Sequence, residues 1–397
     1  MNIGLFTETY YPEINGVATS VFMLKTELER MGQQVYVFTT TTPGAPEFEH
    51  NVFRVPSLPC VFITERRVGM FYSNKLAHVI RKLDLDIIHT HTEFSLGIFG
   101  RLMAKEHRLP IVHTYHTIYE DYTHYINKIH IEAVEQKAKA FMRMFSKIYC
   151  NTAETIVVPT IKVKELLESY HVTKTIEVIP TGIDLEKFNR IRYNTNEMNQ
   201  LRLAYGVKED EKLILSLGRV SAEKNIEELL RIMPTYMKLH DNVKFMIVGD
   251  GPDRERLMKL AESLPCSDRI IFTGSKPWDM IGKFYQIGNV FVSASNSETQ
   301  GLTFIEAMAS ALPVVAKVDP CLDEILEEGY NGYTFQNEKE CMEGLDKILY
   351  STNEIDYCNN AVKKVEKYST AQFAANMLNV YENLLASLVQ GSALPIK

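Results

Sequence analysis

Short apolar segments alternate with amphipathic helical segments along the whole chain, and this alternation restricts the possible fold more than any other feature. Strands that alternate with helices form a parallel sheet with helices on both faces. We therefore predict an α/β fold with doubly wound, Rossmann-like parallel sheets. In the first half, the predicted strands are Ile3–Thr7, Val35–Thr39, Asp86–His89, Ile111–His113, Thr155–Val158 and Ile176–Ile179. The predicted helices there include Val17–Arg30, Ser73–Leu83 and Leu96–Glu106.

The second half repeats this scheme. Its predicted strands are Lys212–Leu217, Val243–Val248, Arg269–Phe272, Val290–Val292 and Pro313–Ala316, and its predicted helices are Ile226–Leu239, Pro252–Ala261, Trp278–Tyr285 and Thr303–Ala311. A length of 397 residues fits about two domains. Pro180 and Gly182 break the pattern before a polar connection that runs to Gln200. We predict domains at 1–180 and 181–367, followed by a closing helix at 368–388.

Composition narrows the class of protein. The net charge of −7 and a pI near 5.9 argue against a nucleic-acid-binding protein. Six scattered cysteines without a C-x-x-C pair are typical of reduced thiols in a cytoplasmic protein. Met1 leads directly into the first strand, so we expect no signal peptide. No apolar run approaches the ~20 residues that a membrane span needs, and any membrane contact is expected to be peripheral.

Charged residues follow the first strand of the second half. Arg219 lies two residues after the end of this strand, and Lys224 precedes the next helix. Ligands of doubly wound sheets bind at the carboxyl ends of the strands, and two such domains facing each other would enclose a cleft. An Arg fork and a Lys charge that converge there suit a diphosphate. The alternative is a solvated loop with an Arg–Glu pair.

A second stretch, from Asn296 to Glu306, places Glu298 and Glu306 around a polar loop that becomes an apolar helix. The N–H groups and the dipole at a helix start favour phosphate, and carboxylates accept hydrogen bonds from sugar hydroxyls. The alternative is a capped surface helix with solvated acids. The further candidate ligand-binding residues of this loop are Thr299, Gln300, Gly301, Leu302 and Thr303.

Two glycine loops also follow strands. Asn15 and Gly16 permit a tight turn after the first strand, and Gly249 would let a base or ribose approach the backbone closely. Neither loop reads G-x-G-x-x-G, and no such fingerprint occurs elsewhere in the chain. A dinucleotide-dependent dehydrogenase is therefore not indicated.

Histidines gather in the first half. They include His89, His91, His113, His116 and His124. Their spacing matches no zinc pattern, and we favour ordinary strand-end histidines over a metal cluster. His116 lies in a dense polar and aromatic loop after a strand, which suits the binding of a sugar.

Two basic, partly apolar segments suggest contact with an anionic lipid surface. Residues 60–83 carry a charge of +4 up to Leu83, from five basic residues and Glu65. Residues 124–149 carry +3, from five basic residues against Glu132 and Glu135. Basic amphipathic stretches dock on anionic membranes. The alternative is that each segment packs on the core and turns a solvated basic face outward.

The set formed by Arg219, Lys224 and the Glu298-x7-Glu306 pair resembles the retaining glycosyltransferases of family 4, which have the GT-B fold. The likeness extends over the Asn15-Gly16-Val17 loop, the His116 segment and the closing helix, which in this fold crosses back to the first domain. Within the family, the His89–Ser95 and His116–Tyr125 segments resemble the bacterial enzymes that make monoglucosyldiacylglycerol.

The resemblance implies an activity and roles for residues. It implies UDP-glucose as donor, diacylglycerol as acceptor, an α-linked product and an enzyme on the inner face of the cell membrane. The first domain would bind the acceptor and dock on the membrane, and the second would bind the nucleotide sugar. Mg²⁺ would stimulate at most, without a protein-ligated site. The implied roles are diphosphate binding for Arg219 and Lys224, sugar contacts for Glu298 and His116, ribose binding for Glu306, and contact with phosphate or sugar for Gly16.

Two kinds of alternative stay open. One keeps the fold but uses another acceptor, such as a phosphoinositide, a soluble sugar or a protein, or another donor such as GDP-mannose. The other is a protein that binds a sugar nucleotide without transferring the sugar.

Overall fold

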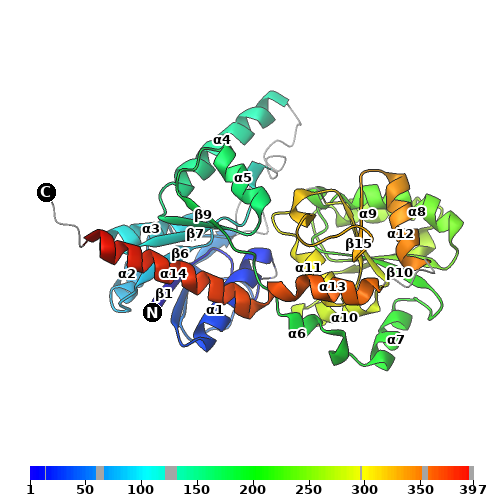
Figure 1. The fold of residues 1–397 in the computed structure, drawn as a ribbon, viewed down its shortest axis with the longest axis horizontal. Coiled ribbons are helices and arrows are strands. Elements are labelled where there is room, and N and C mark those ends of the chain that lie inside the picture. Colours follow the sequence, from blue (N-terminus) through cyan, green and yellow to red (C-terminus); the bar gives the residue numbers. More distant parts are fainter. Residues whose placement is uncertain (14, 60–66, 121–131, 296, 351–355, 393–397) are drawn as a thin grey trace. The chain divides into compact units, whose positions relative to one another are not determined.

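The chain forms two compact units, each built on one parallel β-sheet (Figure 1). Unit 1 comprises Met1–Gly182 with Thr370–Lys397, and unit 2 comprises Ile183–Ser369. The structure is a computed structural model that describes residues 1–13, 15–59, 67–120, 132–295, 297–350 and 356–392. Parts of three predicted features therefore lie outside the described residues, namely 60–66, 121–131 and Asn296. The predicted doubly wound parallel sheets are confirmed.

The sheet of unit 1 has the strand order β3-β2-β1-β6-β7-β8-β9, and all neighbouring strands are parallel. Chain order reverses beside β1, because β2 adds on one side and β6 on the other. The strands are β1 (Asn2–Phe6), β2 (Gln34–Thr40), β3 (Val52–Val55), β6 (Ile87–Thr90), β7 (Ile111–Thr114), β8 (Thr155–Val158) and β9 (Thr175–Val178). An antiparallel hairpin pairs β4 (Ser57–Pro59) with β5 (Arg67–Gly69).

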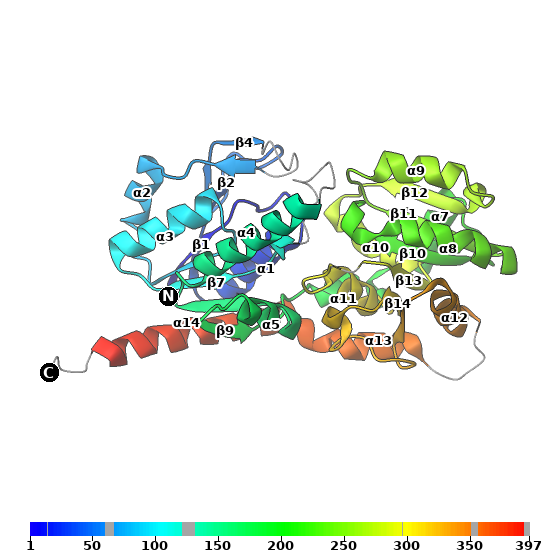
Figure 2. The same cartoon turned by 90° about the horizontal axis from the view of Figure 1, so that it is seen from above.

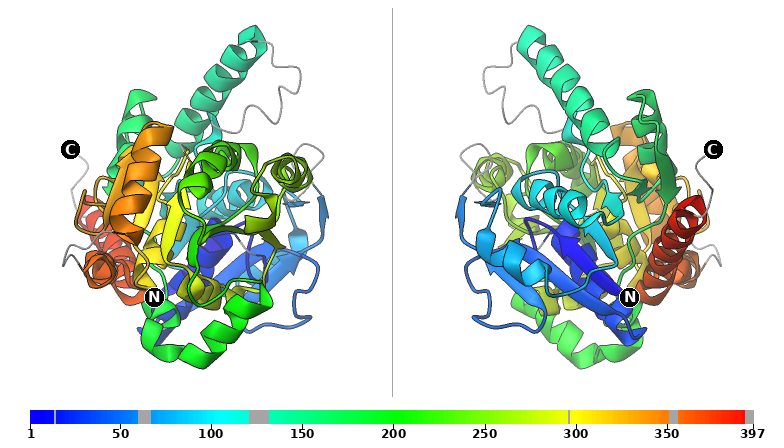
Figure 3. Two further views of the ribbon diagram at one scale, coloured as in Figure 1. Left: turned by 90° about the vertical axis from the view of Figure 1, so that its right-hand side faces the viewer. Right: turned by 90° about the vertical axis from the view of Figure 1, so that its left-hand side faces the viewer.

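Helices cover both faces of this sheet. Leu5 packs in the core beneath α1 and α14, whereas its neighbour Phe6 packs in the core that includes residues of α2 and α3. Helix α14 runs beside α1 (Figure 1). Helix α4 extends outward at its N-terminal end (Figure 3). The helices are α1 (Gly16–Arg30), α2 (Asn74–Ile80), α3 (Ser95–His107), α4 (Glu132–Cys150), α5 (Ile161–Ser169) and α14 (Thr370–Ser392).

The sheet of unit 2 has the order β12-β11-β10-β13-β14-β15 and is also parallel throughout. The first five strands can be followed in this order in Figure 2. Here the order reverses between β10 and β13. The strands are β10 (Lys212–Leu217), β11 (Val243–Val248), β12 (Ile270–Gly274), β13 (Val290–Ser293), β14 (Val314–Lys317) and β15 (Gly332–Phe335).

Two cores flank the sheet of unit 2. Ile214 of β10 packs with residues of α8, α9 and α12, and Leu215 packs with residues of α10, α11 and α13. The helices are α6 (Leu185–Phe188), α7 (Thr195–Ala204), α8 (Ile226–Leu239), α9 (Arg254–Glu262), α10 (Ile281–Ile287), α11 (Leu302–Ala309), α12 (Glu338–Leu349) and α13 (Tyr357–Val365).

The connection between residues 184 and 200 differs from the prediction. It contains α6 and the start of α7 instead of an irregular polar stretch. Asp184 accepts a hydrogen bond from the backbone N–H of Lys187, and Asn194 accepts one from Asn196. These caps satisfy N–H groups at the helix starts, so polar residues that looked like a loop begin helices.

Candidate active site

The predicted cations of unit 2 lie where the strand order of its sheet reverses. The loop after β10 carries Arg219 and Lys224, and the loop after β13 carries Glu298. The neighbouring strands β10 and β13 are parallel, so both loops leave the same edge of the sheet. This is the position at which open parallel sheets bind ligands.

Lys224 and Glu298 form an ion pair across these two loops. Nζ of Lys224 lies 2.5 Å from Oε1 of Glu298, and their side chains are 27% and 10% exposed. Burial by itself would raise the pKa of Glu298, but the charge and hydrogen bond of Lys224, together with a hydrogen bond from Ser295, bring the pKa below its ordinary value. Glu298 is therefore an ionised acceptor, already oriented by a cation.

Arg219 is half-buried two residues beyond β10. Its loop is tied to the loop after β11, because the N–H of Val220 donates to the carbonyl of Asp250 at 2.9 Å. The N–H of Asp253 donates back to the carbonyl of Val220 at 3.1 Å. The guanidinium is thus carried by backbone that two neighbouring strand ends hold in place.

The structure gives a steric reason for a glycine at position 249, which the sequence alone did not show. Its φ is +146°, and a Cβ at this position would lie 1.8 Å from the carbonyl oxygen of Gly218. At Gly251, a Cβ would lie 2.2 Å from the carbonyl oxygen of Val220. Close packing of the two loops therefore requires glycine at both positions.

The start of α11 faces the same strand end. Gly301, which precedes Leu302 and Thr303 with φ +73°, is the N-cap residue of the helix and has no side chain with which to cap it. Thr299 and Gln300 lead into this turn, and Gln300 is buried. A helix start of this kind offers backbone N–H groups and positive potential to an anion.

Glu306 lies further along α11 and differs electrostatically from Glu298. Tyr285 donates a hydrogen bond to its Oε2 at 2.8 Å. Burial raises the pKa of Glu306 to about 7, although Tyr285 and the charge of Lys187 act in the opposite direction. Near neutral pH this carboxyl group therefore exchanges between its neutral and ionised forms.

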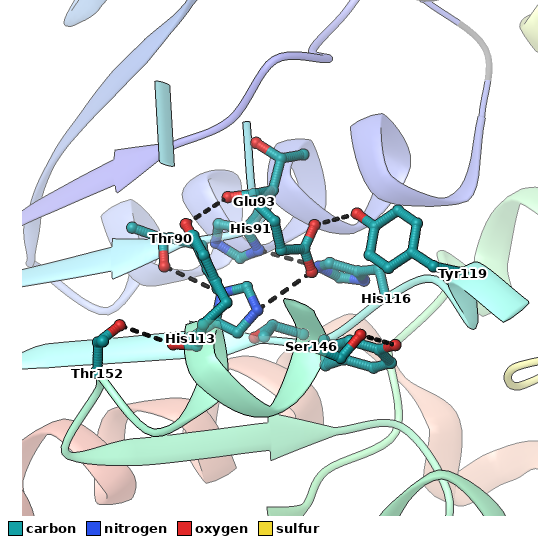
Figure 4. A network of polar contacts seen from close by, with 12 residues as sticks. Thr90, His91, Glu93, His113, His116, Tyr119, Ser146 and Thr152 are labelled. Atoms are coloured by element: carbon teal, nitrogen blue, oxygen red, sulfur yellow. Dashed lines mark hydrogen bonds and ion pairs between the residues drawn. The ribbon is translucent and has the colours of Figure 1, made fainter. Parts of the chain in front are cut away.

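In unit 1, His116 lies among buried polar groups at the ends of β6 and β7 (Figure 4). Its Nε2 is 3.1 Å from Nδ1 of His91. Nearby, Nε2 of His113 is 3.2 Å from Oε1 of Glu93, and both side chains are buried. Tyr119 donates a hydrogen bond to the other oxygen of Glu93. Glu93 and Tyr119 had not been singled out, because only the fold brings them beside His113.

Asn15 and Gly16 form the start of α1. Asn15 is extended, with φ −157°, so it does not adopt the tight turn that we expected. Its Oδ1 accepts a hydrogen bond from the N–H of Ala18 at 3.0 Å, and its Nδ2 donates to Oγ1 of Thr9 at 2.7 Å. The pair therefore caps a helix, and Gly16 is exposed there.

Glu8 is a buried carboxyl group of unit 1 that the sequence patterns did not single out. It follows β1 and is buried, and its Oε1 accepts hydrogen bonds from the N–H of Leu96 and from Oγ of Ser95. These donors belong to the first turn of α3, so Glu8 caps this helix from another part of the chain. Burial raises the pKa of Glu8 above its ordinary value, against these hydrogen bonds.

The outer surface of α4 combines apolar and basic side chains. Phe141, Met144 and Ile148 are 55%, 53% and 58% exposed. Arg143, which forms two 2.8 Å contacts with Glu120, is also exposed. None of the helices in the described ranges is long and apolar enough to span a membrane. Within those ranges, no group of three or more His, Cys, Asp or Glu residues is arranged to hold a metal ion.

Comparisons with known proteins agree with this architecture. The family model described as Glycosyltransferase Family 4 matches residues 14–187, and that of Glycosyl transferases group 1 matches residues 198–366. The chain is 37% identical over 391 residues to an alpha-monoglucosyldiacylglycerol synthase of Streptococcus pneumoniae, covering 98% of this chain and 87% of the relative. It is 34% identical over 390 residues to the alpha-monoglucosyldiacylglycerol synthase of Acholeplasma laidlawii, covering 97% and 98%.

Solved structures share the fold. The sucrose-phosphate synthase of Thermosynechococcus elongatus superposes with a TM-score of 0.75 at 21% identity, covering 97% of this chain and 99% of that one. A glycosyltransferase involved in lipopolysaccharide biosynthesis gives a TM-score of 0.71 at 14% identity, covering 96% and 99%. At these identities the likeness concerns the arrangement of strands and helices.

Proposed function

The chain belongs to the GT-B glycosyltransferases of family 4, and from this premise we propose that it transfers glucose from UDP-glucose to diacylglycerol with retention of the α configuration. Two relatives that align over nearly the whole chain are named as synthases of α-monoglucosyldiacylglycerol. The observation that carries the proposal is the group of cations beside a helix start at the switch point of unit 2.

In this proposal, unit 2 binds the nucleotide sugar. Arg219 and Lys224 bind the diphosphate as a planar fork and a point charge. The backbone of residues 299–303 binds phosphate at the start of α11, and Gly249 lies beside the nucleoside. Glu298 accepts hydrogen bonds from the transferred sugar, which its low pKa and its pairing with Lys224 support.

Further contacts complete the donor site. Glu306 accepts hydrogen bonds from the ribose hydroxyls, a role for which its ionised form is suited. Residues Asn15 and Gly16 approach the phosphate or sugar, supported by the exposure of Gly16 at a helix start. His116 makes a hydrogen bond to the transferred sugar. Unit 1 binds the acceptor.

Transfer then proceeds by displacement on one face of the sugar. The bond between C1 and the β-phosphate oxygen breaks while the acceptor oxygen bonds to C1 from the same face. The departing phosphate oxygen accepts the proton of the acceptor hydroxyl. Arg219, Lys224 and the start of α11 stabilise the charge on the diphosphate as it leaves. Glu298 serves as a sugar ligand and not as a covalent nucleophile, which is the role that membership of family 4 implies.

We also propose that unit 1 docks on an anionic membrane surface, with the enzyme on the inner face of the cell membrane. The exposed apolar residues of α4 and its basic side chains support this proposal. Apolar side chains enter the lipid boundary while basic groups remain at the anionic head groups.

The test is an assay of purified protein with UDP-glucose, UDP-galactose and GDP-mannose, each offered with diacylglycerol vesicles or with soluble sugars, with and without Mg²⁺. We expect glucose transfer from UDP-glucose to diacylglycerol and an α anomer by NMR coupling constants. A β anomer would contradict retention. Transfer only to soluble acceptors, or only from GDP-mannose, would favour another member of the same family.

A further inference from the structure

Two imidazole rings meet at the ends of β6 and β7. His91 is the first residue after β6, and His116 is the second after β7. Nδ1 of His91 lies 3.1 Å from Nε2 of His116, and the rings are 26° from parallel with centroids 5.4 Å apart (Figure 4). His91 is 1% exposed, and its backbone N–H donates to the carbonyl of Phe6 at 2.8 Å. The ring of His91 is therefore held in the core, whereas His116 is partly exposed.

The opposite edge of His91 determines which ring donates. Its Nε2 is buried and has no hydrogen-bond partner in the part of the chain that the structure describes. If His116 donated from Nε2, His91 would carry its own proton on this buried Nε2, where nothing accepts it. Orphaned buried N–H groups are rarer and more costly than an acceptor left without a donor. The favoured arrangement thus places the proton of His91 on Nδ1.

A doubly protonated His91 is disfavoured as well. Burial and the three neighbouring histidines hold the pKa of His91 well below its ordinary range. The ring of His89 lies close to that of His91, with centroids 3.9 Å apart and the rings tilted by 37°. A positive charge would therefore be enclosed among uncharged rings, so a single proton is shared across the contact between His91 and His116.

We propose that His91 is a positioning residue that donates its Nδ1–H to Nε2 of His116 and thereby fixes both the ring and the tautomer of His116. The proton of His116 then resides on Nδ1, so His116 meets a sugar hydroxyl as a hydrogen-bond donor. This inference rests on the proposed function, in which His116 contacts the transferred sugar.

Two variants separate positioning from packing. His91→Leu fills the same space without a donor, whereas His91→Asn keeps an N–H near the position of Nδ1. We expect His91→Leu to lower kcat at least tenfold while the Kd of UDP, which is proposed to bind through unit 2, stays unchanged. His91→Asn should recover most of kcat. Wild-type kcat in His91→Leu, or equal losses in the two variants, would overturn the proposal.

A measurement on the unaltered protein keeps the inference testable if a variant fails to fold. Long-range ¹H–¹⁵N spectra of ¹⁵N-histidine-labelled protein distinguish the two tautomers. We expect Nδ1–H on both His91 and His116, and Nε2–H on His116 would overturn the assignment. This readout needs no turnover, so it stands apart from the proposed function, which fails if the unaltered enzyme transfers no glucose to diacylglycerol.

Discussion

Two carboxyl groups near the start of α11 show how neighbouring side chains set the ionisation of a buried acid. Glu298 touches an ammonium group at 2.5 Å and has a lowered pKa, whereas Glu306 accepts from a neutral phenol at 2.8 Å and has a pKa of about 7. Burial opposes ionisation in both. At Glu298 the charge and hydrogen bond of Lys224 and the hydrogen bond from Ser295 together outweigh burial, whereas at Glu306 the hydroxyl of Tyr285 and the charge of Lys187 do not.

The raised pKa of Glu306 predicts a pH-dependent stability. Its pKa rises from 4.5 in the unfolded chain to about 7 in the fold. Protonated Glu306 therefore favours the folded state. This contribution to the free energy of unfolding is fully present below pH 4.5 and is lost as pH rises through 7, by at most about 3 kcal/mol. Glu306→Gln removes this dependence. The difference in Tm, variant minus wild type, should therefore increase between pH 5 and pH 8 in thermal unfolding.

Glu298→Gln is the matched control. The folded pKa of Glu298 is lowered, so its contribution is present above the unfolded value and is lost only as pH falls. This variant should be destabilised, with a Tm difference that does not increase between pH 5 and pH 8. If both variants gave the same slope in this range, the assignment of the two ionisation states would be wrong.

The role proposed for Arg219 predicts a loss of turnover. Arg219→Ala removes a donor that stabilises the leaving diphosphate, and we expect kcat to fall about 10²–10³-fold. Arg231→Ala is the control, because this arginine of α8 is 70% exposed and pairs with Glu227. Normal turnover in Arg219→Ala, measured with UDP-glucose and diacylglycerol vesicles, would refute the assignment.

Some residues of the candidate site can be singled out from the sequence, and others cannot. Arg219, Lys224 and Glu298 follow strands, so the strand-end rule indicates them without coordinates. Glu8 and Glu93 also follow strands, but their roles depend on donors that the fold brings from α3 and from the loop after β7. Periodicity contains no information about such tertiary partners.

At the scale of elements, the strands of both sheets could be predicted because they are short, buried and apolar. The exceptions are β3, which contains Arg54, and β15, whose sequence Gly-Tyr-Thr-Phe contains no apolar run. Both are only partly buried, and neither has the continuous apolar sequence by which the other strands were recognised. Helix α7 escaped prediction because its first turn is polar and its capping residue, Asn194, resembles a loop residue. The GT-B fold and the family resemblance are confirmed.

The exposed face of α4 predicts a defined membrane contact. Phe141→Ser combined with Ile148→Ser removes two side chains that are 55% and 58% exposed. The loss of this much apolar surface for burial in the lipid should weaken binding to anionic vesicles about tenfold or more, as measured by co-sedimentation. Leu203→Ser on α7 is the control, since Leu203 is 62% exposed but belongs to unit 2. Unchanged vesicle binding in the double variant would exclude α4 as the docking element.

At the scale of the whole molecule, the last helix of the chain, α14, contributes to the core of unit 1, which is otherwise formed by the first part of the chain. Phe373, Met377 and Tyr381 of α14 are buried in the core of unit 1 beside α1. Tyr381 also contacts Nδ1 of His89 at 2.7 Å. Three large side chains contribute about 1.5–3 kcal/mol each, which is comparable with the net stability of a typical domain. The stability of unit 1 should therefore depend on α14, whereas unit 2 ends at Ser369 and contains no residue of α14.

Truncation after Ser369 tests this dependence. We expect the amides of unit 1 to lose protection in hydrogen exchange, because removal of α14 exposes the apolar face of α1, while the amides of unit 2 stay protected and UDP still binds. Truncation after Ser387 is the control, since it keeps Phe373, Met377 and Tyr381 and should leave both units protected. If unit 1 kept its protection without α14, its core would be sufficient without the end of the chain. Loss of protection in both units would instead show that unit 2 depends on unit 1 for its stability.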